Sequence, residues 1–522
     1  MPLKFSNCAG SPESAGLRSP VGQVSDLPWM RPRSGAYILA ACIPALVLTA
    51  CFGPRTDPWQ DPRLPVEKRV EDKLRHMAPG EKLDVRTTEV PPGFPSGAEM
   101  AATWNPDLVR REARAIADEA LALGKDQILA PDVQSYGGDP WLASRLTIAY
   151  VSASQEQGII ATPKFLPAEP GQDERTLRET KLPPFRAAVE EAGTWSMLAR
   201  GDDPAVLTDL LRTDWGIKGF VLPGTPEPRP LLGALFATGY FDRKRRTDGY
   251  LDPIERNQVA ELAAQQSIIL LKNDGGLLPL ESAKVHSIAV IGHVPPEGIR
   301  ERAGALIEVR FATGENLAAA LDLAHKSDVA VVTDPELVPA IAKANPKTIA
   351  VRTDGQMPAG APALLTAWSP RGIAGALFGD VNPAGRLAVA QPPYPFGHGL
   401  SYSTFEYSDL RIFPETPRFG QIVQVTLAVR NTGVRAGAEV VQFYVHQQKP
   451  AVPRPDKELK SFSRIELKPG ETKRVSIVLD RRSMWFYDPA VRDWATQPGV
   501  YDVWIGSSSS DIRLKGSFEL FE

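Results

Sequence analysis

Hydrophobic residues recur at helical spacing through the first half of the chain, and short uninterrupted apolar runs separate these stretches. One helix opens on Asn105-Pro106-Asp107, which places a capping residue, a proline and an acid at its start, and Gly124 follows its end. The pattern predicts helices over about 105–123, 141–157, 184–193 and 203–212, and short strands over 127–130, 159–162 and 219–222. Helices that alternate with short buried strands are typical of parallel α/β architecture.

A second α/β unit is predicted to begin near Asp252-Pro253 with another helix. An apolar run follows at 267–273, and buried strands are predicted at 287–291, 328–333 and 348–353. Gly292 comes directly after one of these strands, but no GxGxxG motif surrounds it. A dinucleotide-binding site therefore has little support.

From residue 421 onwards the hydrophobic period changes to two. Val423, Val425, Leu427 and Val429 alternate with more polar residues, and similar strands are predicted at 439–446, 473–479, 500–505 and 515–521. About 100 residues of this pattern predict a β-sandwich of the immunoglobulin type. We expect three aromatic residues of this unit to belong to its core rather than to a sugar-stacking platform: Trp485, Trp494 and Trp504.

The N-terminal segment has the order of features found in an export signal. Arg31 and Arg33 precede the uncharged apolar run 36–50, which is shorter than the roughly 20 residues that span a bilayer. The run ends Leu48-Thr-Ala-Cys51, which resembles the lipobox of bacterial lipoproteins. We expect residues 1–50 to be cleaved and Cys51 to carry lipid, and Met30 is a second candidate for the first translated residue.

This signal predicts an exported lipoprotein that lies on the outer membrane or another periplasm-facing surface of the bacterial envelope. Residues 51–65 are rich in proline and predict a tether. The alternative is a short buried helix with an incidental cysteine.

Composition narrows the function classes. The chain is 43% hydrophobic and 23% charged, which are globular values. Its 59 basic and 62 acidic residues are nearly balanced, which argues against a nucleic-acid partner. With six His, three Cys and no HExxH, CxxC or P-loop pattern, neither a metal nor a cofactor is expected.

Several stretches resemble glycoside hydrolase family 3, the β-glucosidase-type family. The strongest are Gln266–Leu280 (QSIILLKNDGGLLPL), Leu377–Leu387 (LFGDVNPAGRL) and Phe396–Tyr402 (FGHGLSY), while 67–83, 102–124, 138–142, 182–185 and 211–221 echo its barrel domain. The resemblance implies a shortened TIM-barrel-like domain at 66–250 and an α/β sandwich domain at 251–400. It further implies a linker at 401–420 and a fibronectin type III-like domain at 421–522.

Membership of this family implies a retaining mechanism with two carboxyl groups about 5–5.5 Å apart. The family's nucleophile is an Asp just after the strand predicted at 219–222, in Val-Val-Ser-Asp-Trp. Here the corresponding residues are Val221-Leu-Pro-Gly-Thr225, so Gly224 stands at the nucleophile position. Glycine has no side chain and cannot act as a nucleophile.

Other family positions are also missing. The family's sugar-binding Lys-His pair is Lys164-Phe165 here, so only Lys164 remains as a substrate-binding candidate. The segment with a sugar-binding Asp is absent between Leu83 and Pro91, and an Arg-rich loop after Pro131 is cut short. The second-domain loop that carries the acid/base is also gone. Residues 66–250 number 185, against the roughly 200 to over 400 of a complete barrel, so we expect missing strands or an open α/β layer.

Other carboxylates could stand in for the lost pair. Glu227 lies just beyond Gly224, and Asp334 and Glu336 follow a second-domain strand, so a Glu227–Glu336 pair is conceivable. The simpler interpretation is that all three are solvated loop acids and that Lys164 is a surface lysine. His398 in the FGHGLSY motif is expected to be a structural hydrogen-bonding residue.

Three hypotheses follow for the function. The first is an inactive or weakly active envelope protein that binds a glycan or a partner, with an oligosaccharide or β-glycoside as ligand and the membrane reached through a lipid anchor. The second is an active O-glycosyl hydrolase of the β-glucosidase or β-xylosidase type with a displaced carboxylate pair. The third is the product of a decayed gene.

Overall fold

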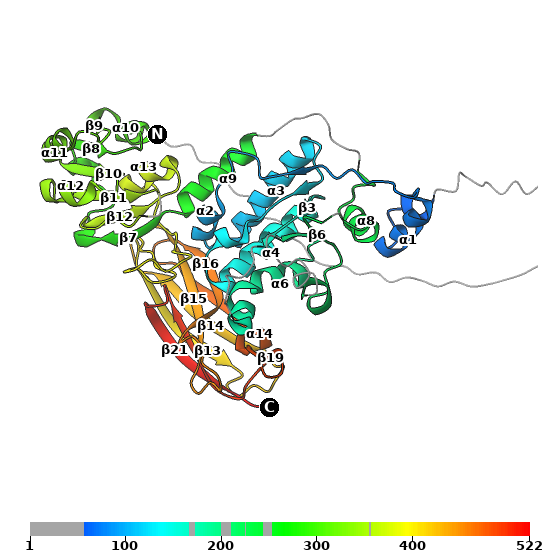
Figure 1. Cartoon of the computed structure of the whole chain (residues 1–522). Coiled ribbons are helices and arrows are strands. Elements are labelled where there is room, and N and C mark those ends of the chain that lie inside the picture. The colour runs from blue at the N-terminus through cyan, green and yellow to red at the C-terminus, as the bar shows by residue number, and fades with distance from the viewer. Residues whose placement is uncertain (1–56, 166–172, 200–209, 225, 244–252, 354–355) are drawn as a thin grey trace, which may run out of the picture. The chain divides into compact units, whose positions relative to one another are not determined.

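The computed structural model describes residues 57–165, 173–199, 210–224, 226–243, 253–353 and 356–522 (Figure 1). The signal, Met30 and Cys51 lie outside these ranges. Residues 57–65, where a tether was predicted, lie against α1 (Val66–His76). The backbone N–H of Trp59 donates to Asp72 at 3.1 Å, and its ring centroid is 5.7 Å from that of Phe241. Within the described ranges, every helix is too short or too polar to cross a bilayer.

The first domain is built on short parallel strands. One sheet has the order β1 (Thr87–Thr88), β2 (Gln127–Ile128), β3 (Ile160–Ala161), and the other has the order β4 (Lys164–Phe165), β5 (Ser196–Ala199), β6 (Phe220–Leu222). The second sheet continues from the first, because the Lys164 N–H donates to the Pro131 carbonyl at 2.9 Å. No pairing joins β6 to β1 among the described residues, so the strands form an open layer.

Helices pack against this layer and bury most of the domain's core. They are α2 (Gly97–Ala102), α3 (Pro106–Ala122), α4 (Pro140–Glu156), α6 (Pro183–Glu190) and α8 (Pro228–Ala237). The predicted cap of α3 is present: the Asn105 side chain accepts from the Asp107 and Leu108 N–H groups. Inside the layer, the Gln127 amide donates to Thr162 at 2.8 Å and to Ser196 at 3.1 Å. The buried Gln127 amide is thus paired with side chains from two other strand segments.

The second domain is a doubly wound α/β sandwich introduced by α9 (Pro253–Gln266). Its sheet has the order β7 (Ile269–Asn273), β12 (Ala363–Thr366), β11 (Thr348–Arg352), β10 (Val329–Val332), β8 (Ser287–Ile291), β9 (Glu308–Ala312), and only β7 is antiparallel. The helices are α10 (Glu297–Ala303), α11 (Leu317–His325), α12 (Val338–Ala344) and α13 (Pro370–Phe378). Two hydrophobic clusters bury β8, β10 and β11 on both faces, as their continuous apolar runs predict.

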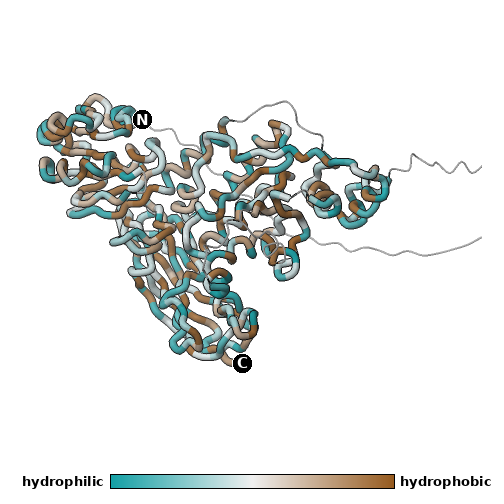
Figure 2. The backbone as a smooth tube through the Cα atoms, viewed as in Figure 1, coloured by the Kyte–Doolittle hydropathy of each residue, from teal (hydrophilic) through white to brown (hydrophobic). Residues whose placement is uncertain are grey.

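The third domain is a β-sandwich of seven main strands. One sheet pairs β13 (Phe405–Phe413), β14 (Val423–Asn431) and β17 (Thr472–Leu479). The other pairs β16 (Glu458–Leu467), β15 (Gly437–Gln447), β20 (Gly499–Gly506) and β21 (Ile512–Leu520). Every second residue of β14 is buried, which is the predicted period of two, and apolar and polar segments alternate along these strands in Figure 2.

One predicted boundary differs from the structure. Residues 401–420 were expected to be a linker, but they contain β13, the first strand of the sandwich. Asp409 adopts a positive φ of 53°, and the pairing with β14 shifts between Ser408 and Arg411. The bulge breaks the alternation of apolar and polar residues, which hid the strand from a period-two search.

Shorter elements complete the described residues. They are η1 (Pro58–Gln60), η2 (Val133–Tyr136), α5 (Glu174–Thr176), η3 (Leu177–Lys181), η4 (Leu210–Asp214), η5 (Asp274–Gly276), η6 (Ser282–Lys284), η7 (Gly304–Leu306), α14 (Arg481–Met484), β18 (Phe486–Asp488) and β19 (Asp493–Ala495).

Candidate functional site

The carboxyl ends of the first-domain strands define the candidate site. In parallel α/β folds, ligands bind beyond the carboxyl ends of the strands. Strand β6 ends at Leu222, and Gly224 follows two residues later at an exposed position. This is the place where the sequence comparison expected a nucleophilic carboxylate.

The backbone at Gly224 does not require glycine. Its φ lies outside the left-handed region, and among the described residues a Cβ added there would meet only the Val221 carbonyl oxygen, at 3.6 Å. That distance is ordinary van der Waals contact. The site therefore has room for a side chain, but the residue present brings no group that could react.

Lys164 lies at the same edge, on β4. Its ammonium is 2.6 Å from the Glu89 carboxylate, which directly follows β1. The Lys164 side chain is 21% exposed and that of Glu89 is 60% exposed. Glu89 was not singled out in the sequence; its position just after a short strand, within the shortened segment 83–91, is the signal that could have found it.

The carboxylates that could replace the lost catalytic pair, Glu227 and Glu336, lie in two separate loops. Glu227 precedes α8, its side chain is 68% exposed, and its ion-pair partner is Arg212 at 3.8 Å. Glu336 is exposed in the loop after β10, where its N–H donates to the Asp334 carboxylate at 3.1 Å. Glu227 and Glu336 therefore lie in loops that follow strands of different sheets, and each contacts its own domain. Their catalytic role stays a prediction.

His398 has a structural environment. Its Nε2 lies 2.9 Å from the Leu271 carbonyl oxygen, and its ring stacks on Tyr394 at 5.1 Å. Burial lowers the pKa of His398, which favours the neutral ring. Across the described residues, no three His, Cys, Asp or Glu side chains gather in a way that would hold a metal ion.

Two acids are buried between α2 and α3. Burial raises the pKa of Glu99 to about 7, against a smaller lowering effect of the Ser96 backbone N–H. Burial also raises the pKa of Glu112 well above its usual range, and the nearby charge of Glu99 adds to this. Tyr136 and Tyr150 close the same region, where burial raises the pKa of each phenol. The cluster is thus electrostatically strained when both acids ionise.

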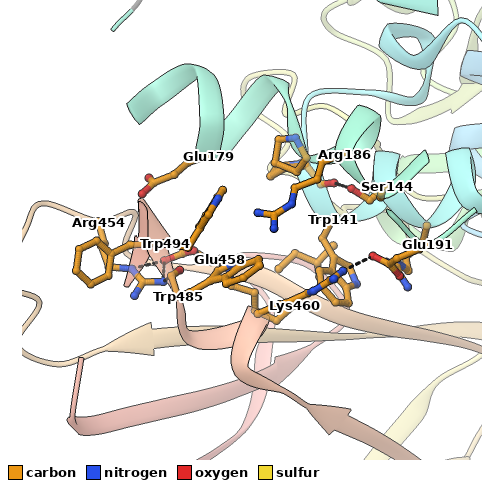
Figure 3. A pocket seen from close by; sticks show the side chains of 17 residues that line it. Trp141, Ser144, Glu179, Arg186, Glu191, Arg454, Glu458, Lys460, Trp485 and Trp494 are labelled. Atoms are coloured by element: carbon orange, nitrogen blue, oxygen red, sulfur yellow. Dashed lines mark hydrogen bonds and ion pairs between the residues drawn. The ribbon is translucent and has the colours of Figure 1, made fainter. Parts of the chain in front are cut away.

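A pocket lies between α4, α6 and the sandwich, with a volume of about 110 Å³ (Figure 3). Trp141 comes from α4, Arg186 from α6, and Trp485 and Trp494 from the β18–β19 hairpin region. The prediction that Trp485 and Trp494 belong to the sandwich core is wrong: both are half-buried and line this pocket. Trp504 is also half-buried and stacks on His446 at 5.0 Å.

Comparisons with known sequences identify the family. The profile of the glycosyl hydrolase family 3 N terminal domain matches residues 83–224, and that of the fibronectin type III-like domain matches residues 439–509. The first match thus extends to Gly224, two residues beyond the end of β6.

Relatives that match most of the chain indicate the same family. Thermostable beta-glucosidase B of Acetivibrio thermocellus is 27% identical, over 81% of this chain and 79% of the relative. A beta-xylosidase of Formosa agariphila is 26% identical, over 81% of this chain and 87% of the relative. The first alignment has 599 positions but takes in only about 420 of the 522 residues here, so roughly 180 positions of it have no residue in this chain.

Solved structures show the same fold. A β-glucosidase from Erythrobacter marinus has a TM-score of 0.74 at 23% identity and covers 87% of this chain and 90% of its own. A family 3 β-glucosidase from Bifidobacterium adolescentis has a TM-score of 0.73 at 24% identity, over 89% and 96%. The chain belongs to glycoside hydrolase family 3, as a shortened, β-glucosidase-like member with a fibronectin type III-like domain.

Proposed function

We propose that this protein binds β-linked carbohydrate at the bacterial cell envelope without hydrolysing it. The observation that carries this proposal is Gly224. A retaining glycosidase needs a carboxylate that attacks the anomeric carbon, and the residue at that position has no functional group.

The other candidate residues in the loops after the strands also support the absence of hydrolysis. The general acid of a glycosidase needs a raised pKa, which usually comes from burial or from a second carboxylate nearby. Glu227 and Glu336 are exposed and lie in loops that follow strands of separate sheets. Exposure and separate sheets both support the interpretation of these two acids as ordinary solvated carboxylates rather than as a catalytic pair.

Binding of carbohydrate is supported by the relatives and by the pocket between α4, α6 and the sandwich. The relatives carry the names of β-glucosidases and a β-xylosidase, and a β-glucosidase of Thermotoga neapolitana was solved in complex with glucose. Aromatic side chains around a pocket give flat apolar faces on which a sugar ring can lie, and this chain has three tryptophans in one pocket.

Envelope attachment through Cys51 is part of the proposal. Two signals normally give stable anchoring, and a lipid-modified N-terminal cysteine carries more than one acyl chain. Metabolic labelling with a tagged palmitate is expected to mark the wild-type protein and to fail for Cys51→Ser. Equal labelling of both proteins, or recovery of both in the soluble fraction, would contradict the anchor.

Hydrolysis is tested with 4-nitrophenyl β-glucoside and β-xyloside on the purified protein. We expect no nitrophenol above the rate of a blank, together with a raised melting temperature in cello- or xylo-oligosaccharides. Turnover that disappears in Glu227→Gln or Glu336→Gln would overturn the proposal and would establish a displaced carboxylate pair.

A further inference from the structure

The pocket between α4, α6 and the sandwich combines aromatic faces with an excess of hydrogen-bond donors. Figure 3 shows Arg186 reaching into it, with Trp494 on one side and Trp141 on the other. The guanidinium carbon of Arg186 lies 4.9 Å from the Trp485 ring centroid and 5.4 Å from that of Trp494. The two indole rings are themselves 4.6 Å apart.

The carboxylates of the pocket are already engaged. Glu191 accepts from Arg145 at 2.7 Å and from Arg482 at 2.8 Å. Glu458 pairs with Arg454 at 2.7 Å and with Lys460 at 2.8 Å. Glu179 accepts from the Tyr487 N–H at 2.8 Å and pairs with Arg175 at 3.0 Å. All three acids in the lining therefore have cationic partners.

Some hydrogen-bond donors of the pocket arginines have no acceptor. Among the described residues, Arg186 Nη1 and Arg145 Nε have no acceptor, and the two side chains are 22% and 31% exposed, so other parts of them are open to solvent. The lining holds five basic side chains, Arg145, Arg186, Arg454, Lys460 and Arg482, against three acids. Glu190 lies just outside it and takes one bond each from Arg186 and Arg482, which still leaves more basic than acidic groups. A guanidinium whose hydrogen-bonding capacity is only partly used gains free energy from a ligand that brings acceptor oxygens to its exposed part.

We propose that this pocket binds an acidic sugar, a pyranose ring that carries a carboxylate, as part of an oligosaccharide. The ring lies against the half-buried indole of Trp141 or Trp494, and the carboxylate accepts from the guanidinium groups of Arg186 and Arg145. This inference rests on the proposed carbohydrate-binding function and adds the site and the class of sugar. It does not depend on whether hydrolysis occurs.

The arrangement differs from a contact that only holds two domains together. Such a contact needs the ion pairs of Glu190 and Glu191 with Arg482, but it does not need three half-buried tryptophans around an open volume. Trp141 stands on α4 with Arg145 of its own helix over its ring, at 4.9 Å. Its replacement therefore alters the pocket without removing the ion pairs between domains.

The test is calorimetric titration of the full mature chain with two matched probes. One probe is an aldotetraouronic acid, a xylotriose that bears one glucuronosyl group, and the other is neutral xylotriose. We expect the acidic probe to bind at least about tenfold more tightly. Arg186→Gln removes donors while it keeps most of the side-chain length, and Trp141→Ala removes one indole face. Trp504→Ala, which changes a tryptophan outside this pocket, is the matched control.

The two pocket variants are expected to weaken binding of the acidic probe by about tenfold or more, and Trp504→Ala to leave it unchanged.

Equal affinity for both probes, or acidic-probe binding that survives in Arg186→Gln and Trp141→Ala, would overturn the inference and leave the proposed function standing. If neither probe binds, the proposed carbohydrate-binding function and the inferred acidic-sugar site are both wrong for these sugars. If nitrophenyl glycosides are cleaved while the pocket variants still lose the acidic probe, only the proposed function fails. Circular dichroism of each variant checks the fold, and Trp141→Phe replaces Trp141→Ala if that variant unfolds.

Discussion

The buried Glu99 predicts a pH-dependent loss of stability. The residue is 7% exposed, and burial raises the pKa of its carboxyl from 4.5 to about 7. The folded protein therefore holds this proton more tightly than the unfolded chain does. As the pH rises from about 4.5 to about 7, the folded state must ionise a buried acid, so the free energy of unfolding falls across this window and stays low above it.

The size of the effect follows from the shift. A change from 4.5 to about 7 corresponds to a loss of about 3 kcal/mol above pH 7, at 1.36 kcal/mol for each pKa unit. Glu99→Gln keeps the size of the side chain and cannot ionise. The variant should match the wild type near pH 4.5 and exceed it by up to about 3 kcal/mol at pH 8. The Glu99 charge also raises the pKa of the neighbouring Glu112. Removing that charge in Glu99→Gln takes away this repulsion and should further stabilise the variant at high pH.

The assay is urea unfolding of both proteins at several pH values, followed by tryptophan fluorescence. Glu301→Gln, at an exposed position on α10, is the matched control and should leave the pH profile unchanged. If wild-type stability does not fall between pH 5 and 7.5, or if Glu99→Gln is no more stable than the wild type at pH 8, the argument from burial is wrong.

Two further predictions concern stability. Arg386 and Glu439 form a 2.7 Å ion pair with side chains only 1% and 2% exposed. Arg386→Met should cost about 3–5 kcal/mol, because the buried Glu439 carboxylate loses its nearest cation and keeps the Tyr407 hydroxyl at 2.8 Å and Arg513 at 3.9 Å. The double variant with Glu439→Gln should recover part of that loss in the same urea assay, and an unchanged midpoint in Arg386→Met would refute this. Gly219→Ala should cost about 1–3 kcal/mol or more, because its Cβ would lie 1.8 Å from the Trp195 carbonyl oxygen. Gly224→Ala should be nearly neutral in a melting experiment, and equal losses in the two variants would contradict the local geometry.

Much of the fold could be predicted because local patterns agree with the tertiary structure. The apolar run at 287–291 is a strand buried on both faces, and the alternation from Val423 is a strand with one buried face. The helix that begins after Asn105 has the predicted cap. These elements depend on neighbours in the sequence, so their signals survive in the sequence alone.

The rest depended on contacts between distant residues. Strand β5 (Ser196–Ala199) is short and pairs only with β4 and β6, so its four residues carry no distinct pattern. The tryptophan pocket joins Trp141 to Trp494, which are far apart in the sequence, and no local signal could link them. Gly224 was found only through the family resemblance, because a glycine after a strand is otherwise an ordinary turn residue.

The most direct test of the central claim is covalent trapping. The full chain is incubated with 2,4-dinitrophenyl 2-deoxy-2-fluoro-β-glucoside, which leaves a long-lived glycosyl ester on the nucleophile of a retaining glycosidase, and its intact mass is then measured. We predict no increase in mass, because Gly224 has no carboxylate to form the ester. A single added fluoroglucosyl group, mapped by peptide sequencing to any Asp or Glu, would contradict the account.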